Sequence, residues 1–523
     1  MRFLIPLRFR LNRTARKYFG WESVRKTQLP AMKAVYKGQD ALVVLPTGGG
    51  KSAIYQLPVL LKKGPAIIIS PLLALQQDQL TRLNERGLNA VRISSAETPK
   101  QQEQALKDLA SGKAKYLFIT PEQLGKPERV AALKKLKPAL VAVDEAHCLS
   151  HWGHDFRPDY LALGEVIKAL GRPPIVALTA TASPPVRDDI SQRLGLRKPM
   201  LQLSGLDRPN IFIETVHSPS TEARYRKLLA LLKAEKGQGI VYVPTRRAAE
   251  ELAERLTASG ADCSFYHGGM TTSTREKCQT GFMSGDIRVM VATSAFGMGI
   301  DKADIRWVAH MALPDSPDSY LQEIGRAGRD GKPSRALLLW SAEDIGLQRF
   351  FAGGKPNASE LAQLAEVLRD IPKSQWHTGT TSRKLTRLTW LLEGIDLARL
   401  TPQQAAQAAI TEAAQRQAVQ LTRIEMMRGF AEAQSCRTRM LLGYFGEQLP
   451  GGCGHCDNCV SSPAAEVPDT QPFPVHSTVQ HAEWGAGTVL SYDSDRMTVL
   501  FERVGYKTLS VSVVQANQLL AVV

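Results

Sequence analysis

The sequence predicts an α/β protein in which two tandem doubly wound domains are followed by a helical subdomain and a small C-terminal β-barrel. Short apolar runs alternate with helical or loop segments within residues 41–203 and again within residues 240–340. Such alternation is typical of parallel sheets covered by helices on both faces. Residues 357–445 instead place Leu, Val and Ala at the spacing of amphipathic helices. From residue 478, apolar and polar residues alternate around glycines, which predicts four or five antiparallel strands.

The apolar runs give the expected strands of both sheets. In the first domain they are residues 41–45, 66–70, 116–120, 139–143 and 175–179. In the second domain they are residues 240–243, 264–266, 289–292, 307–310 and 336–340. Each run is short enough to be a buried strand. Residues 204–220, which contain two prolines, are expected to be a looser connection between the domains.

Domain boundaries follow from these changes of pattern, because a chain of 523 residues exceeds what one core usually organises. We expect α/β domains at 1–205 and 206–345, the helical subdomain at 346–460, a Pro-rich linker at 461–477 and the barrel at 478–523. Within the helical subdomain, residues 371–382 interrupt the pattern. The basic cluster that follows, Arg383, Lys384 and Arg387, is most simply a solvated helix face.

Composition favours a nucleic-acid partner. The net charge is +16 and the pI is near 9.5. An excess of positive charge of this size favours binding to polyanions through counterion release, although it would also favour binding to acidic membranes. No apolar run reaches about 18 residues, so we expect no transmembrane helix. The basic first segment, MRFLIPLRFRLNRTARK, superficially suits a transit peptide, but we favour an ordinary basic first helix, which explains the same composition.

A glycine-rich loop, LPTGGGKS at residues 45–52, follows the first expected strand and precedes a helix. Glycines let backbone amides turn toward phosphate oxygens, and the start of the helix adds its dipole. In such loops the lysine, here Lys51, reaches the β- and γ-phosphates, and the hydroxyl of Ser52 ligates Mg²⁺. The usual pattern has Gly five residues before Gly50, where this chain has Leu45. The loop predicts a nucleoside triphosphate site.

Two carboxylates, Asp144 and Glu145, follow the expected strand at 139–143. A triphosphate with bound Mg²⁺ needs a carboxylate at the end of a neighbouring strand, which is a role for Asp144. Glu145 can orient or activate the attacking water. Two acids after a strand are often only a solvated turn, and it is the upstream glycine-rich loop that favours the catalytic interpretation.

The segment after these acids is rich in rings for a connecting loop. Trp152, Phe156 and the cation Arg157 stand among three histidines in residues 147–157. Rings and guanidinium planes stack on exposed bases, so the segment is a candidate sensor of single-stranded nucleic acid. The alternative is that Trp152 and Phe156 are core residues and the histidines are surface polar residues.

A pair of arginines is expected to complete the phosphate chemistry. QEIGRAGRDG, residues 322–331, places Arg326 and Arg329 three apart, on one face if the segment is helical. Arginine is permanently charged and forks two donors, so one of them can stabilise the transferring γ-phosphoryl group. LTATA at 178–182 follows another expected strand, where its hydroxyls can link the phosphate site to the cleft between the domains, although this signal alone is weak.

Together these segments resemble the RecQ family of superfamily 2 DNA helicases. The resemblance covers most of residues 18–460 and rests on FGWESVRKTQ, TGGGKS, SPLLALQQDQ, DEAH, CLSHWGHDFRPDY, LTATA, TSAFGMGIDKADIRWVAH and SYLQEIGRAGRDG. It implies two RecA-like domains, with ATP, Mg²⁺ and Zn²⁺ as cofactors. It further implies single-stranded and partial-duplex DNA as substrates, a bacterial cytoplasmic protein near the nucleoid, no membrane contact and a monomer.

The resemblance also implies a role for each matching residue. Adenine recognition would belong to Arg25 and Gln28, and the remaining ATP contacts to Thr47, Gly48, Gly49, Gly50, Lys51, Ser52 and Gln322. DNA contacts would come from Ser70, Trp152, Phe156, Arg157 and Thr293. The catalytic set would be Lys51, Asp144, Glu145, His147, Arg326 and Arg329. Within it, Arg329 would be the arginine finger, and His147 would link the acids to the aromatic-rich loop.

Four of the seven cysteines cluster near residue 450. Cys453, Cys456 and Cys459 have the CxxCxxC spacing of metal ligands, and Cys436 on the preceding expected helix supplies a fourth thiolate, in line with the resemblance. We expect a tetrahedral structural zinc site, since four thiolates leave no position for water. Free cysteines in a loop are the alternative. The clustering is not a disulfide framework and indicates a reducing compartment.

The chain departs from the family in two places. Residues 374–411 are expected to be an insertion in the helical zinc-binding region, with no assigned role. The winged-helix domain that normally follows the zinc site is missing. In its place stands a segment that resembles small Tudor-like or SH3-like barrels, which bind protein or nucleic acid, and a passive cap is the alternative.

We therefore expect an ATP-dependent 3′–5′ DNA helicase that acts in recombination and repair. One alternative is an ATP-driven single-strand translocase or annealing factor that unwinds duplex weakly because its wedge is missing. Another is a DNA-binding scaffold whose nucleotide site only switches conformation.

Overall fold

The computed structural model describes residues 6–46, 48–150, 157–203, 205–297, 302–354, 356–371, 376, 382–461, 471–475, 477–493, 495–501 and 504–523. Its contacts divide the chain into two units. Unit 1 comprises Met1–Gly205 and Glu366–Ala398, and unit 2 comprises Leu206–Ala365 and Arg399–Val523. The domain boundaries expected from the sequence stay predictions.

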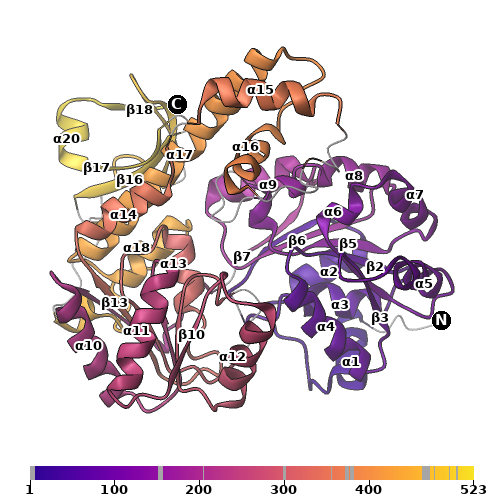
Figure 1. Cartoon of the computed structure of the whole chain (residues 1–523), viewed down its shortest axis with the longest axis horizontal. Coiled ribbons are helices and arrows are strands. Elements are labelled where there is room, and N and C mark those ends of the chain that lie inside the picture. The colour runs from indigo at the N-terminus through magenta and orange to yellow at the C-terminus, as the bar shows by residue number, and fades with distance from the viewer. Residues whose placement is uncertain are drawn as a thin grey trace. The chain divides into compact units, whose positions relative to one another are not determined.

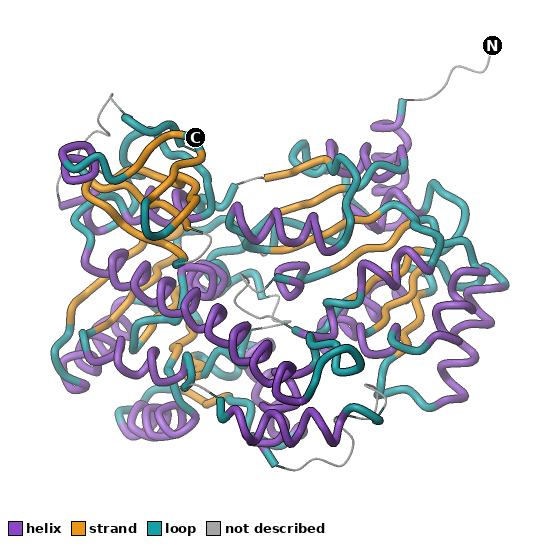
Figure 2. The backbone as a smooth tube through the Cα atoms, turned by 90° about the horizontal axis from the view of Figure 1, so that it is seen from above, coloured by secondary structure: helices purple, strands orange, loops and turns teal. Residues whose placement is uncertain are grey.

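Unit 1 contains a seven-stranded parallel sheet in the order β3-β4-β2-β5-β6-β1-β7. Its strands are β1 (Ala41–Val44), β2 (Ala66–Ile69), β3 (Ala90–Ile93), β4 (Tyr116–Ile119), β5 (Leu140–Val143), β6 (Ile175–Thr179) and β7 (Met200–Leu203). The helices are α1 (Leu7–Phe19), α2 (Leu29–Lys37), α3 (Ala53–Val59), α4 (Leu73–Glu85), α5 (Pro99–Ala110), α6 (Pro121–Leu124), α7 (Pro127–Lys135), α8 (Leu163–Ala169) and α9 (Pro184–Arg193), with two 3₁₀ turns, η1 (Ala146–Leu149) and η2 (Pro158–Tyr160). Helices cover both faces of the sheet (Figures 1 and 2), as the apolar runs predict.

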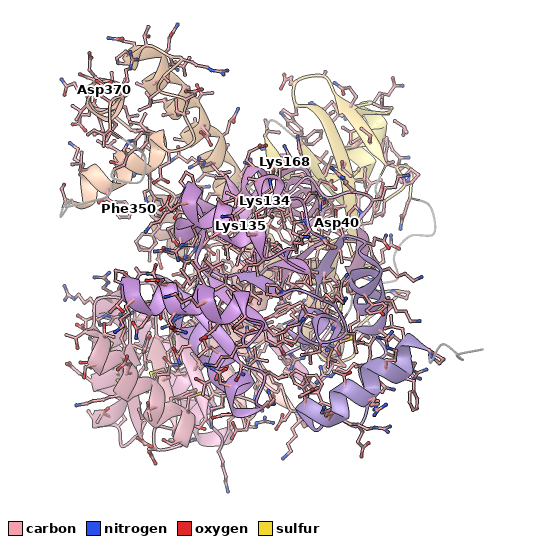
Figure 3. The ribbon with its side chains drawn as sticks, turned by 90° about the vertical axis from the view of Figure 1, so that its right-hand side faces the viewer. Asp40, Lys134, Lys135, Lys168, Phe350 and Asp370 are labelled. Carbon is pink, nitrogen blue, oxygen red and sulfur yellow. The ribbon has the colours of Figure 1, made fainter. Side chains whose placement is uncertain are left out.

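A buried carboxylate fixes the amino ends of three strands in this sheet. Asp40, just before β1, accepts hydrogen bonds from Arg172 and from the backbone N–H groups of Ile175 and Arg197; Figure 3 labels it. Burial would raise the pKa of Asp40, but the hydrogen bonds, above all that of Arg172, hold it below its ordinary value. The starts of β1 and β6 and the approach to β7 are thereby held at the edge opposite their carboxyl ends.

Unit 2 contains a six-stranded parallel sheet in the order β10-β11-β9-β12-β13-β8. The strands are β8 (Ile211–His217), β9 (Gly239–Tyr242), β10 (Cys263–Tyr266), β11 (Val289–Ala292), β12 (Trp307–His310) and β13 (Ser334–Trp340). The helices that follow them are α10 (Thr221–Ala234), α11 (Arg246–Ala258), α12 (Thr272–Ser284), α13 (Pro317–Ile324) and α14 (Glu343–Phe351). One expectation was wrong: residues 204–220 are not merely a loose connection, because they include the edge strand β8.

Helices replace strands after residue 357, as predicted. They are α15 (Ala358–Leu368), α16 (Arg383–Leu392), the long α17 (Pro402–Glu432), α18 (Arg437–Tyr444) and α19 (Asp457–Ser461). The expected insertion at 374–411 holds α16 and the start of α17. In the described ranges, no helix combines the length and the hydropathy that a membrane crossing needs.

The C-terminal segment folds into a five-stranded antiparallel sheet in the order β17-β16-β15-β14-β18. Its elements are β14 (Thr478–His481), β15 (Gly485–Asp493), β16 (Arg496–Phe501), β17 (Gly505–Ser510), α20 (Val511–Ala516) and β18 (Leu520–Val522), and we call them together the C-terminal sheet. Phe473, from the expected linker, packs into the core of this sheet. Most of the remaining linker lies outside the described residues. The small antiparallel fold predicted from the alternating pattern is confirmed.

Candidate functional site

The order of strands in unit 1 brings three sequence motifs to one edge of its sheet. β5, β6 and β1 are neighbours, and parallel strands end at the same edge. The glycine-rich loop follows β1, the acids Asp144 and Glu145 follow β5, and the LTATA segment ends β6. Motifs more than 90 residues apart in the sequence therefore meet where open α/β sheets usually bind ligands.

The glycine-rich loop has a backbone that only glycine adopts easily. Gly48 and Gly50 have φ angles of 82° and 74°, in the left-handed region that costs other residues energy. Gln28 donates hydrogen bonds from Nε2 to the carbonyl oxygens of Gly49 (3.0 Å) and Gly50 (3.1 Å), and Arg25 donates to that of Gly48 (3.2 Å). The two side chains assigned to adenine by the family resemblance thus lie directly beside the phosphate loop. Thr47 lies outside the described residues.

Asp144 is buried beside the lysine of that loop. Burial, and then the charge of Glu145, raise the pKa of Asp144 from 3.8 to about 7, although the charge of Lys51 acts in the opposite direction. Lys51 also donates from Nζ to the Leu45 carbonyl oxygen at 3.3 Å. A carboxyl group whose pKa is this close to 7 is only partly ionised at neutral pH, and a cation placed next to it would stabilise the ionised form. The donor set of Asp144 and the Ser52 hydroxyl therefore fits a hard, oxygen-seeking ion such as Mg²⁺.

Glu145 is strained and incompletely paired. Its φ and ψ are both 47°, a left-handed conformation that costs a residue with a side chain on the order of 1 kcal/mol or more. Its Oε2 atom is buried and has no hydrogen-bond partner among the described residues, while His147 Nδ1 lies 3.4 Å away. Backbone strain and a carboxylate oxygen without a hydrogen-bond partner, both at one residue, are typical of a site that binds a substrate or a water molecule.

A chain of hydrogen bonds links the acids to the LTATA segment. Thr179 donates from Oγ1 to the carbonyl oxygen of Thr181 at 2.9 Å, and His147 Nδ1 lies 2.9 Å from the same Oγ1. Because the hydroxyl proton is already used toward Thr181, His147 donates from Nδ1. The histidine thus joins the end of β5 to the end of β6. That the LTATA hydroxyls link the phosphate site to the cleft between the domains stays a prediction.

We expect Asp144→Asn to stabilise the nucleotide-free protein at pH 8. A carboxyl pKa raised on folding imposes no cost below the unfolded value of 3.8, and the cost grows as the pH rises toward the folded value of about 7. A rise of about three units corresponds to roughly 4 kcal/mol above pH 7. The gain in melting temperature of Asp144→Asn over wild type should therefore increase from pH 4 to 7 and then level off. Asp188→Asn, which removes an exposed carboxylate of the same unit, is the control; an equal gain at pH 4 and pH 8 would contradict the assignment.

The other DNA-contact residues expected in unit 1 are only partly described. Ser70 follows β2 and is buried, and its carbonyl oxygen accepts a 2.6 Å hydrogen bond from Gln76. The Arg157 backbone N–H donates to the Cys148 carbonyl oxygen at 2.9 Å. Trp152 and Phe156 lie outside the described residues, so their role as a sensor stays a prediction.

The arginines expected to act on phosphate follow α13 in unit 2 but are not on it. The helix ends at Ile324, and Gly325–Asp330 form turns, so the condition that Arg326 and Arg329 share a helical face is not met. Gly328 has a φ of 56°, which a helix does not allow. Arg326 is buried and donates from Nη1 to the Gly297 carbonyl oxygen. Arg329 is less buried.

Two side chains hold this arginine segment, which we define as residues 325–331. Arg208 donates to the carbonyl oxygens of Ala327 (3.0 Å) and Gly328 (2.8 Å). Asn210 donates to the Gly328 carbonyl oxygen at 2.8 Å. Gln322, which the sequence assigned to ATP, lies half-buried on α13 one turn before Arg326. The segment is therefore preorganised by the start of unit 2.

A cavity of about 450 Å³ opens at the carboxyl ends of β9, β10 and β11 in unit 2. Its lining includes Thr293, which was expected to contact DNA, together with Thr245, Arg246, Ser294 and Phe351. Phe351 is 50% exposed and its neighbour Phe350 is 79% exposed; Figure 3 labels Phe350. Hydroxyls and a guanidinium for phosphate lie beside a ring that a base can stack on. The sequence pattern did not reveal Arg246 or Phe351, and the only signal was the pair of phenylalanines at a helix end.

The four clustered cysteines meet in unit 2. Their Sγ atoms all lie within 4.8 Å of one another, and Cys436 and Cys456 are fully buried. Tetrahedral zinc with thiolates at about 2.3 Å would place the sulfurs about 3.8 Å apart, so the cluster fits zinc with a small contraction. Backbone N–H groups of Arg439 and Cys453 point at Cys436 Sγ, which favours the thiolate form. The Cys₄ site expected from the spacing is confirmed.

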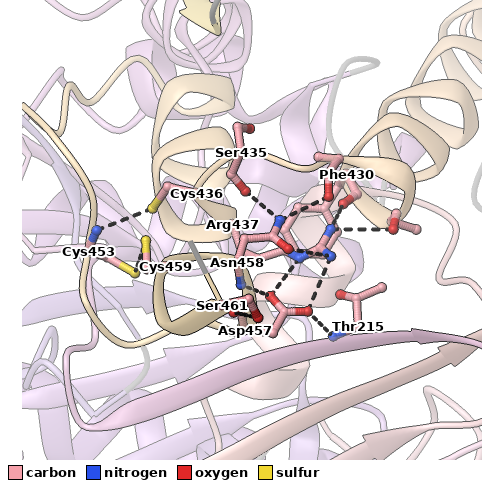
Figure 4. A network of polar contacts seen from close by, with 12 residues as sticks. Thr215, Phe430, Ser435, Cys436, Arg437, Cys453, Asp457, Asn458, Cys459 and Ser461 are labelled. Atoms are coloured by element: carbon pink, nitrogen blue, oxygen red, sulfur yellow. Dashed lines mark hydrogen bonds and ion pairs between the residues drawn. The ribbon is translucent and has the colours of Figure 1, made fainter. Parts of the chain in front are cut away.

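The zinc site is fastened to the parallel sheet of unit 2. Arg437 forms a paired contact with Asp457, with distances of 3.0 Å and 3.2 Å, and the Thr215 N–H on β8 donates to the same carboxylate at 2.9 Å; Figure 4 shows this network beside the cysteines. The Ile213 N–H also donates to the His455 carbonyl oxygen at 3.3 Å. The cysteine-bearing loop is thus anchored on the edge strand β8.

Three known families match the parts of the chain that carry these sites. Residues 25–190 match the family DEAD/DEAH box helicase, and residues 223–331 match the helicase conserved C-terminal domain. Residues 396–460 match RecQ zinc-binding. The probable ATP-dependent DNA helicase RecS of Bacillus subtilis is 39% identical over 369 residues, which is 70% of this chain and 73% of that protein. The chain belongs to the RecQ family of helicases.

Other RecQ-family relatives extend beyond the match. The ATP-dependent DNA helicases RecQ of Bacillus subtilis and Haemophilus influenzae are each 36% identical, over 450 and 448 residues. The match covers 86% and 85% of this chain but only 66% and 62% of those proteins. Residues 477–519, which form most of the C-terminal sheet, match a protein family of unknown function (DUF3553). Where the described RecQ-family chain continues after the zinc site, it forms this antiparallel sheet, not a winged helix.

Solved structures support the fold of this RecQ-family chain. The DUF1998 helicase MrfA bound to DNA and AMPPNP has a TM-score of 0.54 and 23% identity, covering 69% of this chain and 55% of that one. The Mycobacterium smegmatis helicase Lhr bound to single-stranded DNA and AMP-PNP has a TM-score of 0.52 and 19% identity, covering 90% and 68%. Identities this low show a shared fold and nothing further.

Proposed function

We propose that the protein is an ATP-dependent DNA helicase that moves 3′ to 5′ on single-stranded DNA and unwinds duplexes during recombination and repair. The observation that carries the proposal is the meeting of the phosphate loop, the two acids and the His147–Thr179 link at one edge of the unit 1 sheet, in a chain of the RecQ family. The cysteine cluster, which fits a metal site and not a disulfide framework, and the bacterial relatives favour the bacterial cytoplasm, at the nucleoid, as its location.

In this proposal each residue beside the phosphate loop has one task in ATP binding. Arg25 and Gln28 hold the adenine, the amides of residues 48–50 hold the phosphates, and Lys51 neutralises the charge of the β- and γ-phosphates. Ser52 and Asp144 would hold Mg²⁺, which supplies further charge neutralisation when bound with ATP. The proximity of Gln28 to the loop carbonyl oxygens supports this division.

Hydrolysis would depend on Glu145 and on the arginine segment. Glu145 has a buried oxygen atom that lacks a hydrogen-bond partner in the described ranges, which suits it to orient and deprotonate the attacking water. In this proposal Arg329 stabilises the γ-phosphoryl group during its transfer, and Arg326 and Gln322 hold the arginine segment and the phosphates in place. Repeated binding and hydrolysis of ATP would move the protein along DNA.

DNA would contact both units. In unit 1, Ser70, Arg157 and the aromatic residues Trp152 and Phe156 would report bound DNA to the acids through His147. In unit 2, Thr293 and Arg246 would bind phosphate, and the exposed ring of Phe351 would stack on a base. A protein with a net charge of +16 attracts such a polyanion without further recognition.

The second candidate function is a single-strand translocase or annealing factor with weak unwinding. One observation favours it. The family resemblance leads us to expect a winged helix after the zinc site, but the described residues there form an antiparallel sheet. In this case ATP would still be hydrolysed on DNA, and only strand separation would be poor.

ATP turnover with and without single-stranded DNA tests the proposal. We expect stimulation by DNA, and loss of turnover in Lys51→Ala. Phe351→Ala should raise the DNA concentration for half-maximal stimulation by about tenfold, because stacking of one base is worth about 1–3 kcal/mol, with maximal turnover unchanged. Val367→Ala, another exposed apolar residue at 63% exposure, is the matched control. Turnover that does not respond to DNA would contradict the helicase and the translocase alike, and DNA binding without any turnover would leave the scaffold.

A further inference from the structure

The C-terminal sheet packs closely on two helices of the zinc-binding region in unit 2. β17 lies against α17 and β15 against α18, and the sheet and α17 are seen together in Figure 1. A Cβ atom added to Gly505 would lie 2.5 Å from Thr422 Oγ1, and one added to Gly443 would lie 2.7 Å from Ser491 Cβ. Because the backbone approaches its neighbours this closely at two separate points, the sheet is a fixed part of unit 2.

A tyrosine pair connects the sheet to α13. The ring of Tyr506 on β17 stacks on that of Tyr444 at the end of α18, with centroids 5.0 Å apart and planes at 30°. Tyr444 donates from its hydroxyl to Asp318 Oδ2 at 2.5 Å. Burial, and then the charge of Asp318, raise the pKa of Tyr444 well above its ordinary value, so the hydroxyl remains a donor. All three residues are at most 3% exposed.

A buried cation completes this junction. Arg423 on α17 is 2% exposed and interacts electrostatically with Tyr444, Asp318 and Tyr506. Burial alone would lower the pKa of Arg423, but these neighbours raise it above the ordinary value. The tyrosines are neutral, so the charge of the buried Arg423 is compensated by the carboxylates among its neighbours, Asp318 and Asp315. Asp318 is thus held by the Tyr444 hydroxyl and by the charge of Arg423, and the Tyr506 ring packs on Tyr444.

Asp318 stands at the start of the helix that leads to the arginines. It lies in the first turn of α13, whose N-cap is Ser316, and α13 runs directly into the arginine segment. The helix is only eight residues long, so a shift of its first turn is carried to its end.

We propose that the C-terminal sheet positions the arginine segment for ATP hydrolysis. Tyr506 acts through Tyr444 on Asp318, which fixes the start of α13 and so the placing of Arg329. The inference rests on the proposed role of Arg329, and it gives this sheet a task within the motor instead of that of a passive cap.

Full-length variants at the tyrosine pair test the proposal. Tyr506→Ala removes the stacked ring, and Tyr444→Phe removes only the hydroxyl that holds Asp318. Tyr506→Phe keeps the ring. The matched control is Tyr492→Ala, because Tyr492 is buried in the same sheet but bonds only within it, to the backbone of Phe473 in the contacts described. All four variants are compared by thermal denaturation, so that turnover is expressed per folded molecule.

A positioning role predicts that kcat falls while KM for ATP stays nearly unchanged. Tyr506→Ala and Tyr444→Phe should lower the kcat of DNA-stimulated ATP hydrolysis by about ten- to a hundredfold, the cost of a misplaced catalytic group, with KM for ATP within about twofold of wild type. Tyr506→Phe should restore kcat, and Tyr492→Ala should keep it even where it lowers the melting temperature. Equal kcat in wild type and Tyr444→Phe would overturn the proposal, and this conservative variant remains informative if Tyr506→Ala does not fold.

Hydrogen exchange gives a readout that does not need activity. In the protein without nucleotide, amides of residues 317–331 should exchange faster in Tyr506→Ala than in Tyr492→Ala. Unchanged exchange there would contradict the positioning role even if the wild-type chain hydrolysed no ATP. Failure of wild-type turnover, by contrast, would count against the proposed function alone.

Discussion

Replacing Arg329 by Ala is expected to lower DNA-stimulated ATP turnover by about 10³- to 10⁵-fold, the range for loss of an arginine that stabilises the γ-phosphoryl transition state. Binding of ATP should change little, because the phosphate loop, Gln28 and Lys51 all belong to unit 1. Steady-state turnover and binding of a fluorescent ATP analogue measure the two effects separately.

Two further variants show which arginine is the finger. Arg329→Lys keeps the charge but loses the forked donors, so it should recover only a small part of the activity. Arg326→Ala should instead lower the melting temperature, because Arg326 is buried and bonded to the Gly297 carbonyl oxygen. If Arg326→Ala stays folded and loses as much turnover as Arg329→Ala is expected to lose, the finger is Arg326.

Replacing Cys436 by Ser is expected to abolish stoichiometric zinc binding and to unfold the zinc-binding region. Wild type should carry one zinc per chain by elemental analysis. Structural zinc contributes on the order of 10 kcal/mol of folding free energy, which exceeds the stability of most domains. The loss should spread to β8, because Asp457 joins the cysteine-bearing loop to Thr215.

The control for this variant is Cys278→Ser, a partly buried cysteine of the same unit that is not in the cluster. It should keep one zinc and the wild-type melting temperature to within a few degrees. A Cys436→Ser protein that retains one tightly bound zinc per chain would mean that the cluster is not the zinc site.

All three strands that the sequence missed lie at sheet edges, although one edge strand, β10, was predicted. Central strands such as β1, β2 and β5 are buried along their whole length, and their sequences are continuous apolar runs. The missed strands are β3, β7 and β8. Half or fewer of their residues are buried, and polar residues such as Arg92 and Glu214 interrupt their apolar runs. An edge strand of a parallel sheet has no periodic signal that separates it from a loop.

The features of the candidate site also divide into those that the sequence predicted and those that it did not. Residues in a motif with a fixed spacing, such as Lys51, Asp144 and the four cysteines, were found because the chemistry needs them at that spacing. Features that depend on distant segments were not found. The stack of Tyr506 on Tyr444 joins residues 62 positions apart, and the left-handed backbone of Glu145 follows from packing at the ends of β5 and β6. Neither leaves a local pattern in the sequence.

Strand release from tailed duplexes tests the central claim most directly. With ATP and Mg²⁺, a partial duplex with a 3′ single-stranded tail should be separated and one with a 5′ tail should not, and Lys51→Ala should separate neither. ATP hydrolysis on the 3′-tailed duplex without strand release would contradict the helicase and leave the translocase, and preference for the 5′ tail would contradict the proposed direction.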